Sequence, residues 1–352
     1  MSSQLTLDPS NLLERWAALR EAEPRLRQRD AAKRLGVSEA EIIAAQLGAA
    51  AVRLTTDWPA IFEGIATLGP VMALTRNDHA VIEKTGPYAV AQFHGRVGTV
   101  LGEEIDLRIF LSRWHVGFAL VEETPRGTRR SLQFFNQQGE AVHKVFQTGE
   151  TEIEAFDALI ARFKSAEQHH DLALSPKAAP KAEKPDAEVD VEALRKGWEG
   201  LQDTHDFVNL LKETGVSRTQ AMRLVGHEWA RPVGVMSQRQ ACETAVATQL
   251  PIMVFVGNPG MIEIHTGPIN KLVQMETWFN ILDPGFNLHL DEAGVTHAWV
   301  VRKPTRDGIV TSLELFDAEG EVVALFFGKR KPGNPELEAW REVAASLPTL
   351  VE

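Results

Sequence analysis

The segment Ser131-Leu-Gln-Phe-Phe-Asn136 returns as Ser312-Leu-Glu-Leu-Phe-Asp317, 181 positions further along the chain. Other segments keep the same separation, and a register held over several segments does not arise by chance. The chain is therefore a tandem duplication. The other matched pairs are 69–77 with 250–258, 85–87 with 266–268, and 139–140 with 320–321.

The two copies are joined by a stretch that has no apolar face to bury. Residues 173–190 contain three prolines among alanines and charged residues, a composition typical of a semi-extended linker. Upstream of the strongest matches, Gly36-Val-Ser38 pairs with Gly215-Val-Ser217 at a separation of 179, so only about two residues of insertion separate the frames. We predict a first repeat at 1–172, a linker at 173–190 and a second repeat at 191–352.

Each repeat opens with apolar residues at helical spacing, over residues 11–34 and 192–214. Gly36 and Gly215 stand where a left-handed residue ends a helix. A capping box that starts the next helix is predicted after each glycine. The predicted capping pairs are Ser38 with Glu41 and Ser217 with Gln220.

Runs typical of β-strands follow in each repeat, and turn signals at 138–139 and 319–320 indicate hairpins and hence antiparallel sheets. A helix is predicted at 336–341, just after Pro335. The fold class is therefore α+β, with each half made of N-terminal helices, a large antiparallel sheet and a C-terminal helix. The predicted strands are 90–93, 117–121, 131–135, 142–146, 297–301, 312–316 and 322–327.

The amino-acid composition, net charge and cysteine count exclude several classes of protein. The 352 residues have 44% hydrophobic and 24% charged residues, which is ordinary globular composition for two domains. The net charge of −11 disfavours general binding to nucleic acids or anionic membranes but allows a local basic groove. One cysteine, Cys242, excludes an internal disulfide and a cysteine-based zinc site. Without a signal-peptide core or a membrane span, we expect a cytoplasmic protein.

Motif searches give mostly exclusions. The sequence has no dinucleotide or P-loop glycine motif, no HExxH and no GxSxG, so it offers no recognised hydrolase centre. Residues 30–48 have the outline of a helix-turn-helix. Its second helix, 38–46, carries two acids and no base, the wrong sign for phosphate. We expect a packed helical hairpin and no stable nucleic-acid binding.

Polar positions that differ between the repeats are candidates for a site. His205 pairs with Leu26 in the 179 frame, and Asp203 could cap a helix that has His205 in its first turn. A helix N-terminus disfavours the imidazolium, leaving a neutral ring that can bind a metal. The alternative is an ordinary surface or capping histidine.

A second candidate is Arg108, which pairs with His289 in the 181 frame. Strand alternation places Asp106, Arg108 and Phe110 on one face. The alternative for Arg108 is a surface ion pair. The second repeat also carries a set of bases, for which solvated faces are the alternative: Arg218, Arg302, Lys303, Lys329 and Arg330.

The duplication resembles, in the order and spacing of its motifs, the HemS/ChuS/PhuS (HmuS) family of bacterial cytoplasmic haem-binding and hemin-degrading proteins. The motifs are IDLRIF at 105–110, DTH at 203–205 before an LLK helix, FNLHL at 286–290 and FFGKRKPG at 326–333. The resemblance covers nearly the whole chain. It implies haem (iron protoporphyrin IX) as the ligand.

The resemblance assigns roles residue by residue. It implies His205 as the proximal iron ligand and Arg108 on the distal side, where its permanent charge lets it donate to an iron-bound water or O₂. Phe110 and Phe255 would lie beside the macrocycle. Basic residues Arg218, Lys303 and Arg330 would hold the propionates. Phe327 stands where the family often has a tyrosine, and the only tyrosine here is Tyr88.

These residue types suit haem, a flat apolar disc with two carboxylates and an iron that needs a neutral nitrogen ligand. The favoured function is a carrier that takes haem from an inner-membrane importer to a haem oxygenase or another acceptor. The alternative is an enzyme that opens the porphyrin with an external electron donor. A third is a haem-responsive DNA-binding regulator. His79 or His289 would support a second, weaker haem site, against the alternative of ordinary hydrogen bonding.

Overall fold

The computed structural model describes residues 9–24, 26–125, 127–179, 182–203, 206–330 and 333–350. They form two compact units, each described separately below. Unit 1 draws on Met1–Thr75, Lys84–Ala178 and Asn258–Ile262, and unit 2 on Arg76–Glu83, Ala179–Gly257 and Glu263–Glu352. Each unit is thus built mainly from one repeat and includes a short segment of the other.

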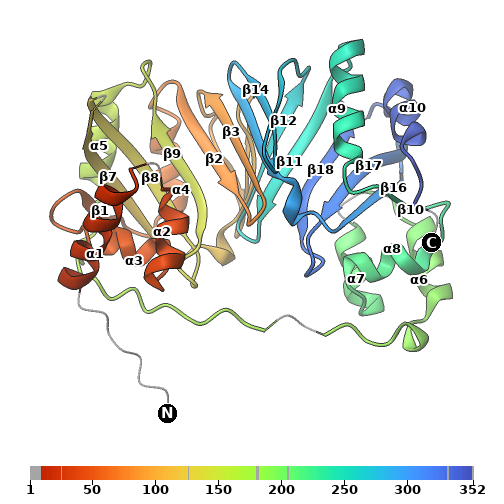
Figure 1. Cartoon of the computed structure of the whole chain (residues 1–352), viewed down its shortest axis with the longest axis horizontal. Coiled ribbons are helices and arrows are strands. Elements are labelled where there is room, and N and C mark those ends of the chain that lie inside the picture. The colour runs from red at the N-terminus through yellow and green to blue at the C-terminus, as the bar shows by residue number, and fades with distance from the viewer. Residues whose placement is uncertain are drawn as a thin grey trace. The chain divides into compact units, whose positions relative to one another are not determined.

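Unit 1 has helices on both sides of an antiparallel sheet (Figure 1). Its strands run in the order β1-β7-β8-β9-β2, and a second set runs β6-β5-β4. The helices are α1 (Pro9–Ala22), α2 (Gln28–Leu35), α3 (Glu39–Ala44), α4 (Trp58–Ile65) and α5 (Ile153–Phe163), with a 3₁₀ turn at Leu111–Arg113. The strands are β1 (Ala51–Arg53), β2 (Val71–Arg76), β4 (Gln92–His94), β5 (Val97–Leu101), β6 (Asp106–Phe110), β7 (Val116–Thr124), β8 (Gly127–Phe135) and β9 (Ala141–Gln147).

Unit 2 repeats this plan with strands in the orders β10-β16-β17-β18-β11 and β15-β14-β13. Four strands have residues in both units: β2 and β11 through their last residues, Arg76 and Asn258, and β3 (Ala80–Gly86) and β12 (Met261–Gly267). The helices are α6 (Val191–Glu199), α7 (Asp206–Thr214), α8 (Arg218–Val225), α9 (Ser237–Thr248) and α10 (Glu338–Ser346), with 3₁₀ turns at Asp186–Glu188 and Glu292–Gly294. The strands are β10 (Ala230–Val233), β11 (Ile252–Asn258), β13 (Leu272–Met275), β14 (Trp278–Asp283), β15 (Phe286–Asp291), β16 (His297–Thr305), β17 (Gly308–Phe316) and β18 (Val322–Gly328).

The predicted α+β fold and its duplication are confirmed. The antiparallel meander β7-β8-β9 of unit 1 corresponds to β16-β17-β18 of unit 2. Both meanders shift register at the same repeat position, between Phe134 and Phe135 in one and between Leu315 and Phe316 in the other. The turns that follow have glycines in the left-handed region, Gly139 with φ 74° and Gly320 with φ 78°. The two halves therefore share their strand irregularities as well as their strands.

The predicted helical stretches at 11–34 and 192–214 are each two helices. In unit 1 the break follows Ala22 and includes Pro24, whose ring and missing N–H interrupt a helix. In unit 2, α6 ends at Glu199 and Gly200 is its C-cap. The glycine signals were right, since Gly36 and Gly215 have φ of 71° and 66°.

One of the two predicted capping boxes is complete. The Ser38 side chain accepts from Glu41 N, and the Glu41 carboxylate accepts from Ser38 N at 2.7 Å. Ser217 likewise accepts from Gln220 N at 3.0 Å. The reciprocal half predicted for Gln220 was wrong, because its amide donates instead to Lys184 O and Asp186 Oδ1, both at 2.7 Å. That amide ties residues from the end of the linker to α8.

Two other boundaries differ from expectation. The strand predicted at 90–93 begins only at Gln92, and Val90, which is 70% exposed, lies outside it. The helix predicted at 336–341 begins at Glu338. Glu336 is buried outside it, where its carboxylate accepts the backbone N–H of Thr311 at 2.8 Å. A tertiary contact thus displaces the start of α10.

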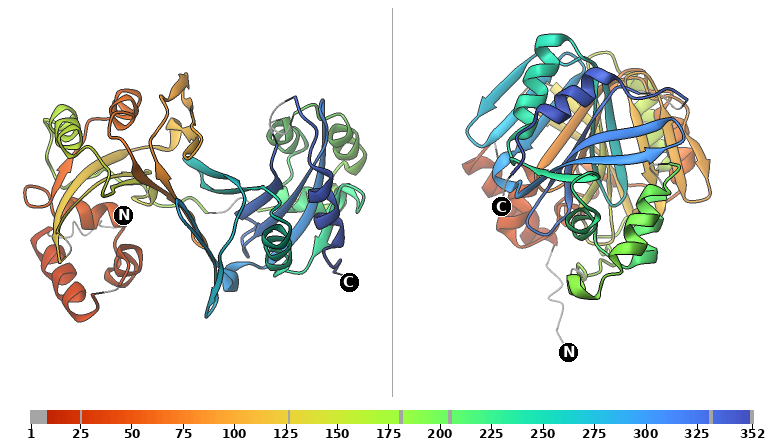
Figure 2. Two further views of the ribbon diagram at one scale, coloured as in Figure 1. Left: turned by 90° about the horizontal axis from the view of Figure 1, so that it is seen from above. Right: turned by 90° about the vertical axis from the view of Figure 1, so that its right-hand side faces the viewer.

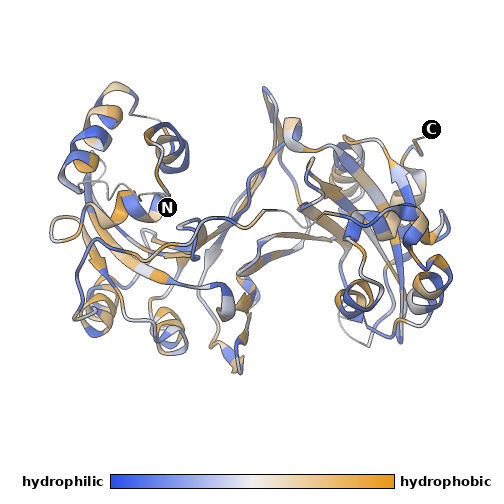
Figure 3. Cartoon of the chain, turned by 90° about the horizontal axis from the view of Figure 1, so that it is seen from below, coloured by the Kyte–Doolittle hydropathy of each residue, from blue (hydrophilic) through white to orange (hydrophobic). Residues whose placement is uncertain are grey.

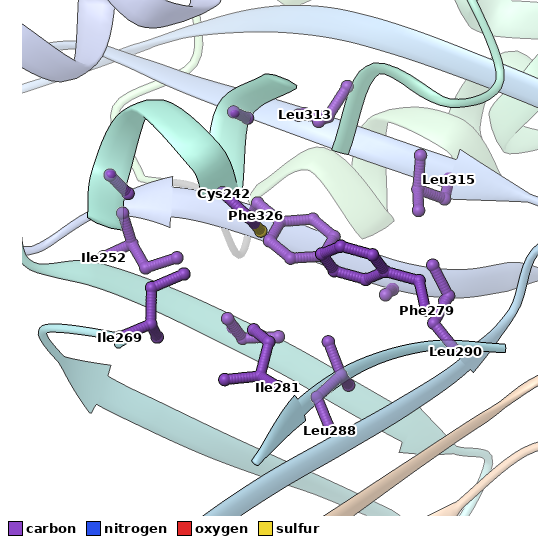
Figure 4. Packing of buried hydrophobic residues seen from close by; sticks show 14 of the residues in the cluster. Cys242, Ile252, Ile269, Phe279, Ile281, Leu288, Leu290, Leu313, Leu315 and Phe326 are labelled. Carbon is purple, nitrogen blue, oxygen red and sulfur yellow. The ribbon is translucent and has the colours of Figure 1, made fainter. Parts of the chain in front are cut away.

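The helices of unit 2 cover two faces of its main sheet. Helices α9 and α10 lie side by side over one face (Figure 2). There Cys242 of α9 is buried beside Phe326, Leu313 and Ile252 (Figure 4), and burial raises the pKa of its thiol, so it is a packing residue. Helices α6, α7 and α8 pack around Trp198 and Phe207 against the end of the other face. Hydrophobic and hydrophilic residues share the same elements, as one-sided burial requires (Figure 3).

In unit 1, the short helix α3 is a core element. Five of its residues are buried, among them Ile42 and Ile43, and it packs against the strand residues Phe118 and Phe135. A helix whose residues are buried in this way has no face to place in a DNA groove. The structure therefore gives residues 30–48 the packed helical hairpin that the sequence indicated. No helix in the described parts of the chain is long and apolar enough to span a membrane.

Candidate functional site

The predicted site residues fall in both units. Arg108 and Phe110 belong to unit 1, whereas the others belong to unit 2. His205, the predicted iron ligand, lies outside the described residues; α7 begins at the next residue, Asp206. The unit 2 residues are Arg218, Phe255, Lys303, Phe327 and Arg330.

In unit 2, the sheet face that packs against α6, α7 and α8 is covered by these helices at β16 but is only half-buried at β18 and β11. The register places Trp299 beside Glu314, Glu314 beside Leu325 and Leu325 beside Phe255. At the β16 end of this row the face lies under the α6–α8 cluster, which includes Trp299. At the β18 and β11 end, Leu325 and Phe255 are only half-buried.

The half-buried end of the face is aromatic. Phe255 of β11 and Phe327 of β18 are in ring contact, with centroids 4.9 Å apart and planes inclined at 58°. Met253 stands opposite Phe327 in the register and is also half-buried. Two of the predicted residues, Phe255 and Phe327, therefore lie together on an apolar surface.

A buried ion cluster borders this surface. Glu314 is fully buried, and its Oε1 accepts from Lys303 Nζ at 2.6 Å and from Ser312 Oγ at 2.7 Å. Its Oε2 accepts from Arg218 Nη2 at 2.7 Å and Nε at 2.9 Å. Ser312 stands opposite Phe327 in the register, so the cluster adjoins the aromatic pair. With two cations on one carboxylate, the cluster has a net positive charge.

Local structure explains how the two cations reach Glu314. Arg218 is the first residue of α8, directly after the N-cap Ser217, and its guanidinium lies 5.4 Å from the ring centroid of Phe207 on α7. Lys303 Nζ lies 4.6 Å from the same centroid. Aromatic faces attract cations at these distances. Phe207 thus helps to position both cations.

Burial and charge act against one another in this cluster. The pKa of Lys303 is lowered to about 8, mainly by burial. The negative charge of Glu314 opposes this lowering, and the positive charge of the nearby Arg218 adds to it. For Glu314, burial alone would raise the pKa, but Arg218, Lys303 and the Ser312 hydroxyl together lower it to about 2. At neutral pH Glu314 is therefore ionised.

The three predicted bases of unit 2 differ in availability. The Arg218 side chain is 26% exposed, whereas that of Lys303 is 6% exposed and its ammonium is turned to Glu314. Arg330 follows β18 and is 19% exposed, with Nη2 3.7 Å from Asp307 Oδ2. Arg218 and Lys303 are thus brought together at one carboxylate, while Arg330 pairs with a different acid.

In unit 1, the predicted alternation along β6 is confirmed. Leu107 and Ile109 are buried, and Asp106, Arg108 and Phe110 share the opposite, half-buried face. The Arg108 guanidinium contacts the Asp106 carboxylate and donates to Leu107 O at 3.1 Å.

The neighbouring strand makes this β6 face more apolar. On β5, Val97 pairs with Phe110 and Leu101 with Asp106, and the two side chains are 49% and 61% exposed. The face thus combines one arginine with exposed apolar groups.

The two other histidines make ordinary polar contacts. His289 Nδ1 lies 2.6 Å from Asn280 Oδ1, and its Nε2 is 4.0 Å from Glu83. His79 Nε2 is 4.0 Å from Asp317 Oδ2. Within the described ranges, no three His, Cys, Asp or Glu residues gather as a metal site.

Sequence reasoning missed Glu314, the residue that organises the unit 2 cluster. The repeats carried a signal, since position 314 corresponds to Gln133, and Arg218 corresponds to Glu39. In unit 1, Glu39 is buried and pairs with Lys144 at 2.9 Å. The sign of the charge at this helix position is thus inverted between the repeats, from Glu39 in unit 1 to Arg218 in unit 2.

Comparisons with known proteins agree with the duplication and the fold. A family model described as the haemin-degrading HemS.ChuX domain matches residues 36–163 and again 215–347. Hemin transport protein HmuS of Yersinia pestis is 40% identical over 342 residues, covering 96% of this chain and 97% of that protein.

Solved structures give similar matches. Holo-PhuS, a heme-binding protein from Pseudomonas aeruginosa, is 50% identical with a TM-score of 0.96, covering 97% of this chain and 100% of that one. ChuS, a heme-degrading enzyme of Escherichia coli O157:H7, is 38% identical with a TM-score of 0.90, covering 97% and 99%. With a family match in each repeat and relatives that align over nearly its whole length, the protein belongs to the HemS/ChuX family.

Proposed function

We propose that the protein is a cytoplasmic haem-binding protein of bacterial haem uptake, which receives imported haem and delivers it for iron release. The observation that carries the proposal is the half-buried Phe255–Phe327 surface bordered by the Arg218–Lys303–Glu314 cluster. An apolar surface with cations beside it suits a flat aromatic ligand that carries carboxylates. The relatives named for hemin transport and heme binding support the same ligand.

The residues of unit 2 fit haem in two respects. Phe255, Phe327 and Leu325 offer half-buried apolar area for a macrocycle. Arg218 uses its Nε and Nη2 groups on Glu314, and a guanidinium has further N–H donors for a propionate. Since the Lys303 ammonium is buried against Glu314, we propose that it fixes the carboxylate that positions Arg218. Arg330 is proposed as a second propionate contact.

His205 is proposed as the axial iron ligand. It precedes α7, whose first residue is Asp206, and a neutral imidazole is the form that binds iron. Bound haem would supply an iron centre with one further coordination position open to exchange. We propose Arg108 as the donor toward a ligand at that position, because arginine keeps its protons at all physiological pH values. Phe110 is proposed to contact the macrocycle.

Carrier and enzyme differ in the fate of the ligand. We favour the carrier, with an inner-membrane importer as source and a haem oxygenase or other acceptor as destination; the relative HmuS, named a hemin transport protein, supports this choice. The enzyme is the second candidate, since the structural relative ChuS is described as a heme-degrading enzyme. Such an activity would require an external electron donor.

A hemin titration followed by Soret absorbance tests the proposal. We expect the wild type to bind one haem with a sharp Soret band, and His205→Ala to lose that band. His289→Ala is the matched control and should behave as the wild type, because its ring is already held by Asn280. Wild type without saturable binding would overturn the haem proposal. A normal band in His205→Ala would overturn only the assignment of the ligand.

A second step separates the two roles. Reductant is added in air to the hemin complex, and the spectrum is followed over time. A stable complex that passes intact haem to an added acceptor is the result expected for a carrier. Bleaching of the Soret band toward a ring-opened product would instead assign the enzyme.

A further inference from the structure

Unit 2 has a cavity on the face of β16 opposite the ion cluster. The cavity has a volume of about 610 Å³ and is lined by β10, β16, β17 and α10. Strand alternation separates it from the candidate haem surface, because Arg302 points to the α10 side and Lys303 to the Glu314 side. The sequence analysis named Arg302 only as one of several bases.

Three arginines from different elements line this cavity: Arg231 of β10, Arg302 of β16 and Arg341 of α10. Arg231 is held in place by donating to Leu347 O and Ala344 O, both at 2.9 Å, and to Thr349 Oγ1 at 2.6 Å. Its partners are all neutral, and burial lowers the pKa of Arg231. A fixed, partly buried cation whose hydrogen-bond partners among the described residues are neutral is a strong attractant for an anion.

The other two arginines add to the positive charge. Arg302 is exposed, and its guanidinium donates to Glu228 O at 3.4 Å. Arg341 pairs with Glu336 at 3.3 Å. Two further titratable groups, the exposed His227 and Glu228, also line the cavity. Three guanidinium groups therefore face the two carboxylates of Glu336 and Glu228.

Several residues that line the cavity differ from their counterparts in unit 1. The registers of β1 with β7 and of β10 with β16 make Val52 the counterpart of Arg231 and Val121 that of Arg302. Val121 pairs with Arg130 as Arg302 pairs with Thr311. In unit 1, Arg130 fills this place with a two-bond contact to Asp157, at 2.6 and 2.9 Å. In unit 2 the smaller Thr311 stands at the position of Arg130, and arginines stand where unit 1 has Val52 and Val121.

We propose that this cavity binds a small organic polyanion, whose phosphate or carboxylate groups contact Arg231, Arg302 and Arg341. The guanidinium fork matches both kinds of oxyanion. Val300 and Ile309 in the lining provide apolar area for the body of the ligand, and the volume lies within the range of small-molecule sites. This site is independent of haem, since it uses the opposite face of the strand.

Calorimetric titration of the full-length protein with pyrophosphate and with citrate, at low ionic strength, tests the site. Arg302→Gln is the first variant, and Arg306→Gln is its control, because Arg306 is exposed in the β16–β17 turn and does not line the cavity. Ala345→Glu adds a negative charge to the lining from an exposed position on α10, and Ala345→Gln adds the same bulk without charge. Circular dichroism verifies that each variant is folded.

We expect one equivalent of a probe to bind, about tenfold or more weakly in Arg302→Gln and Ala345→Glu, because a charge-assisted contact contributes roughly 1.5–3 kcal/mol. The two control variants should bind as the wild type does. Tighter pyrophosphate binding assigns the phosphate class, and tighter citrate binding assigns the carboxylate class. Failure of both probes to saturate the wild type, or equal affinities of Arg302→Gln and Arg306→Gln, would overturn the site. Hemin stoichiometry should be the same in all four variants.

Discussion

Lys303 Nζ lies 2.6 Å from Glu314 Oε1 in a part of unit 2 where the two residues are 5% and 0% exposed. The other carboxylate oxygen accepts two bonds from Arg218, the first residue of α8. One buried carboxylate thus connects two strands to the start of a helix. Removing this carboxylate should lower the stability of the protein, because it would leave buried cations without their counter-charge.

Glu314→Gln should lower the free energy of unfolding by about 3–5 kcal/mol, because it leaves Lys303 buried without a counter-charge. Urea unfolding followed by circular dichroism measures the change. Glu321→Gln, an exposed glutamate at the start of the same hairpin, should stay within about 0.5 kcal/mol of the wild type. A loss below about 1 kcal/mol for Glu314→Gln would contradict the role assigned to the cluster.

The double variant Glu314→Gln with Lys303→Met should regain part of that loss, since it removes the buried cation together with its partner. A double-mutant cycle gives the interaction free energy, which we expect to be roughly 2–3 kcal/mol for groups in direct contact. If the two losses simply add, Lys303 and Glu314 do not stabilise one another and the cluster is held by packing alone.

Acid should destabilise the protein through the same carboxylate. Its pKa is about 2 in the folded chain against an ordinary 4.5, so the unfolded state binds more protons between these values. Stability from Glu314 is therefore complete above about pH 4.5 and is lost as the pH falls toward 2. The loss is about 3 kcal/mol for a shift of this size. Urea unfolding between about pH 6 and pH 2.5 should show the free energy of unfolding of the wild type falling toward that of Glu314→Gln. If the difference between the two free energies does not change with pH, the pKa shift is ruled out.

The duplicated fold was predictable because local signals and long-range signals agreed. Gly36 and Gly215 end their helices in the left-handed region, as their positions in the two copies indicated. The matched segments Ser131–Asn136 and Ser312–Asp317 include the ends of β8 and β17. The predicted start of the last helix was wrong. Glu336 belongs to the pattern of a helix, but a backbone N–H on another strand binds its carboxylate instead.

The candidate site was only partly predictable for a physical reason. Sequence alone shows which side chains are charged but not which charges are already paired inside the protein. Lys303 and Arg218 both bind Glu314, a buried carboxylate that no pattern in its strand singles out. Tyr88 shows the same limit: it is buried in unit 1, with its hydroxyl 2.6 Å from His143 Nε2, which no local pattern indicates.

Hemin affinity should depend on the aromatic pair of unit 2. Phe327→Ala removes the ring that contacts Phe255, so a smaller apolar surface remains for a ligand to bind. We expect hemin to bind roughly tenfold more weakly, since a buried phenylalanine contributes about 1.5–3 kcal/mol. Phe327→Tyr keeps the ring and adds a hydroxyl donor, so its affinity should equal or exceed that of the wild type. Soret titrations measure all three proteins, and an unchanged affinity in Phe327→Ala would remove this surface from the haem site.

Arg108→Gln tests the proposed role of unit 1. Hemin should still bind with the same stoichiometry, because the axial ligand is assigned to His205, but the ferric absorption bands should shift and haem should dissociate several times faster. The physical reason is the loss of a permanently charged donor that contacts Asp106 on a half-buried face.

Asp106→Asn is the matched variant for Arg108. It keeps the arginine but removes the carboxylate that holds it, so the guanidinium is free to turn toward a ligand. We expect smaller spectral changes than in Arg108→Gln and no faster dissociation. Should Arg108→Gln retain both the wild-type bands and the wild-type dissociation rate, the arginine is a surface ion pair. In that case the exposed Val97 and Leu101 beside it need another explanation.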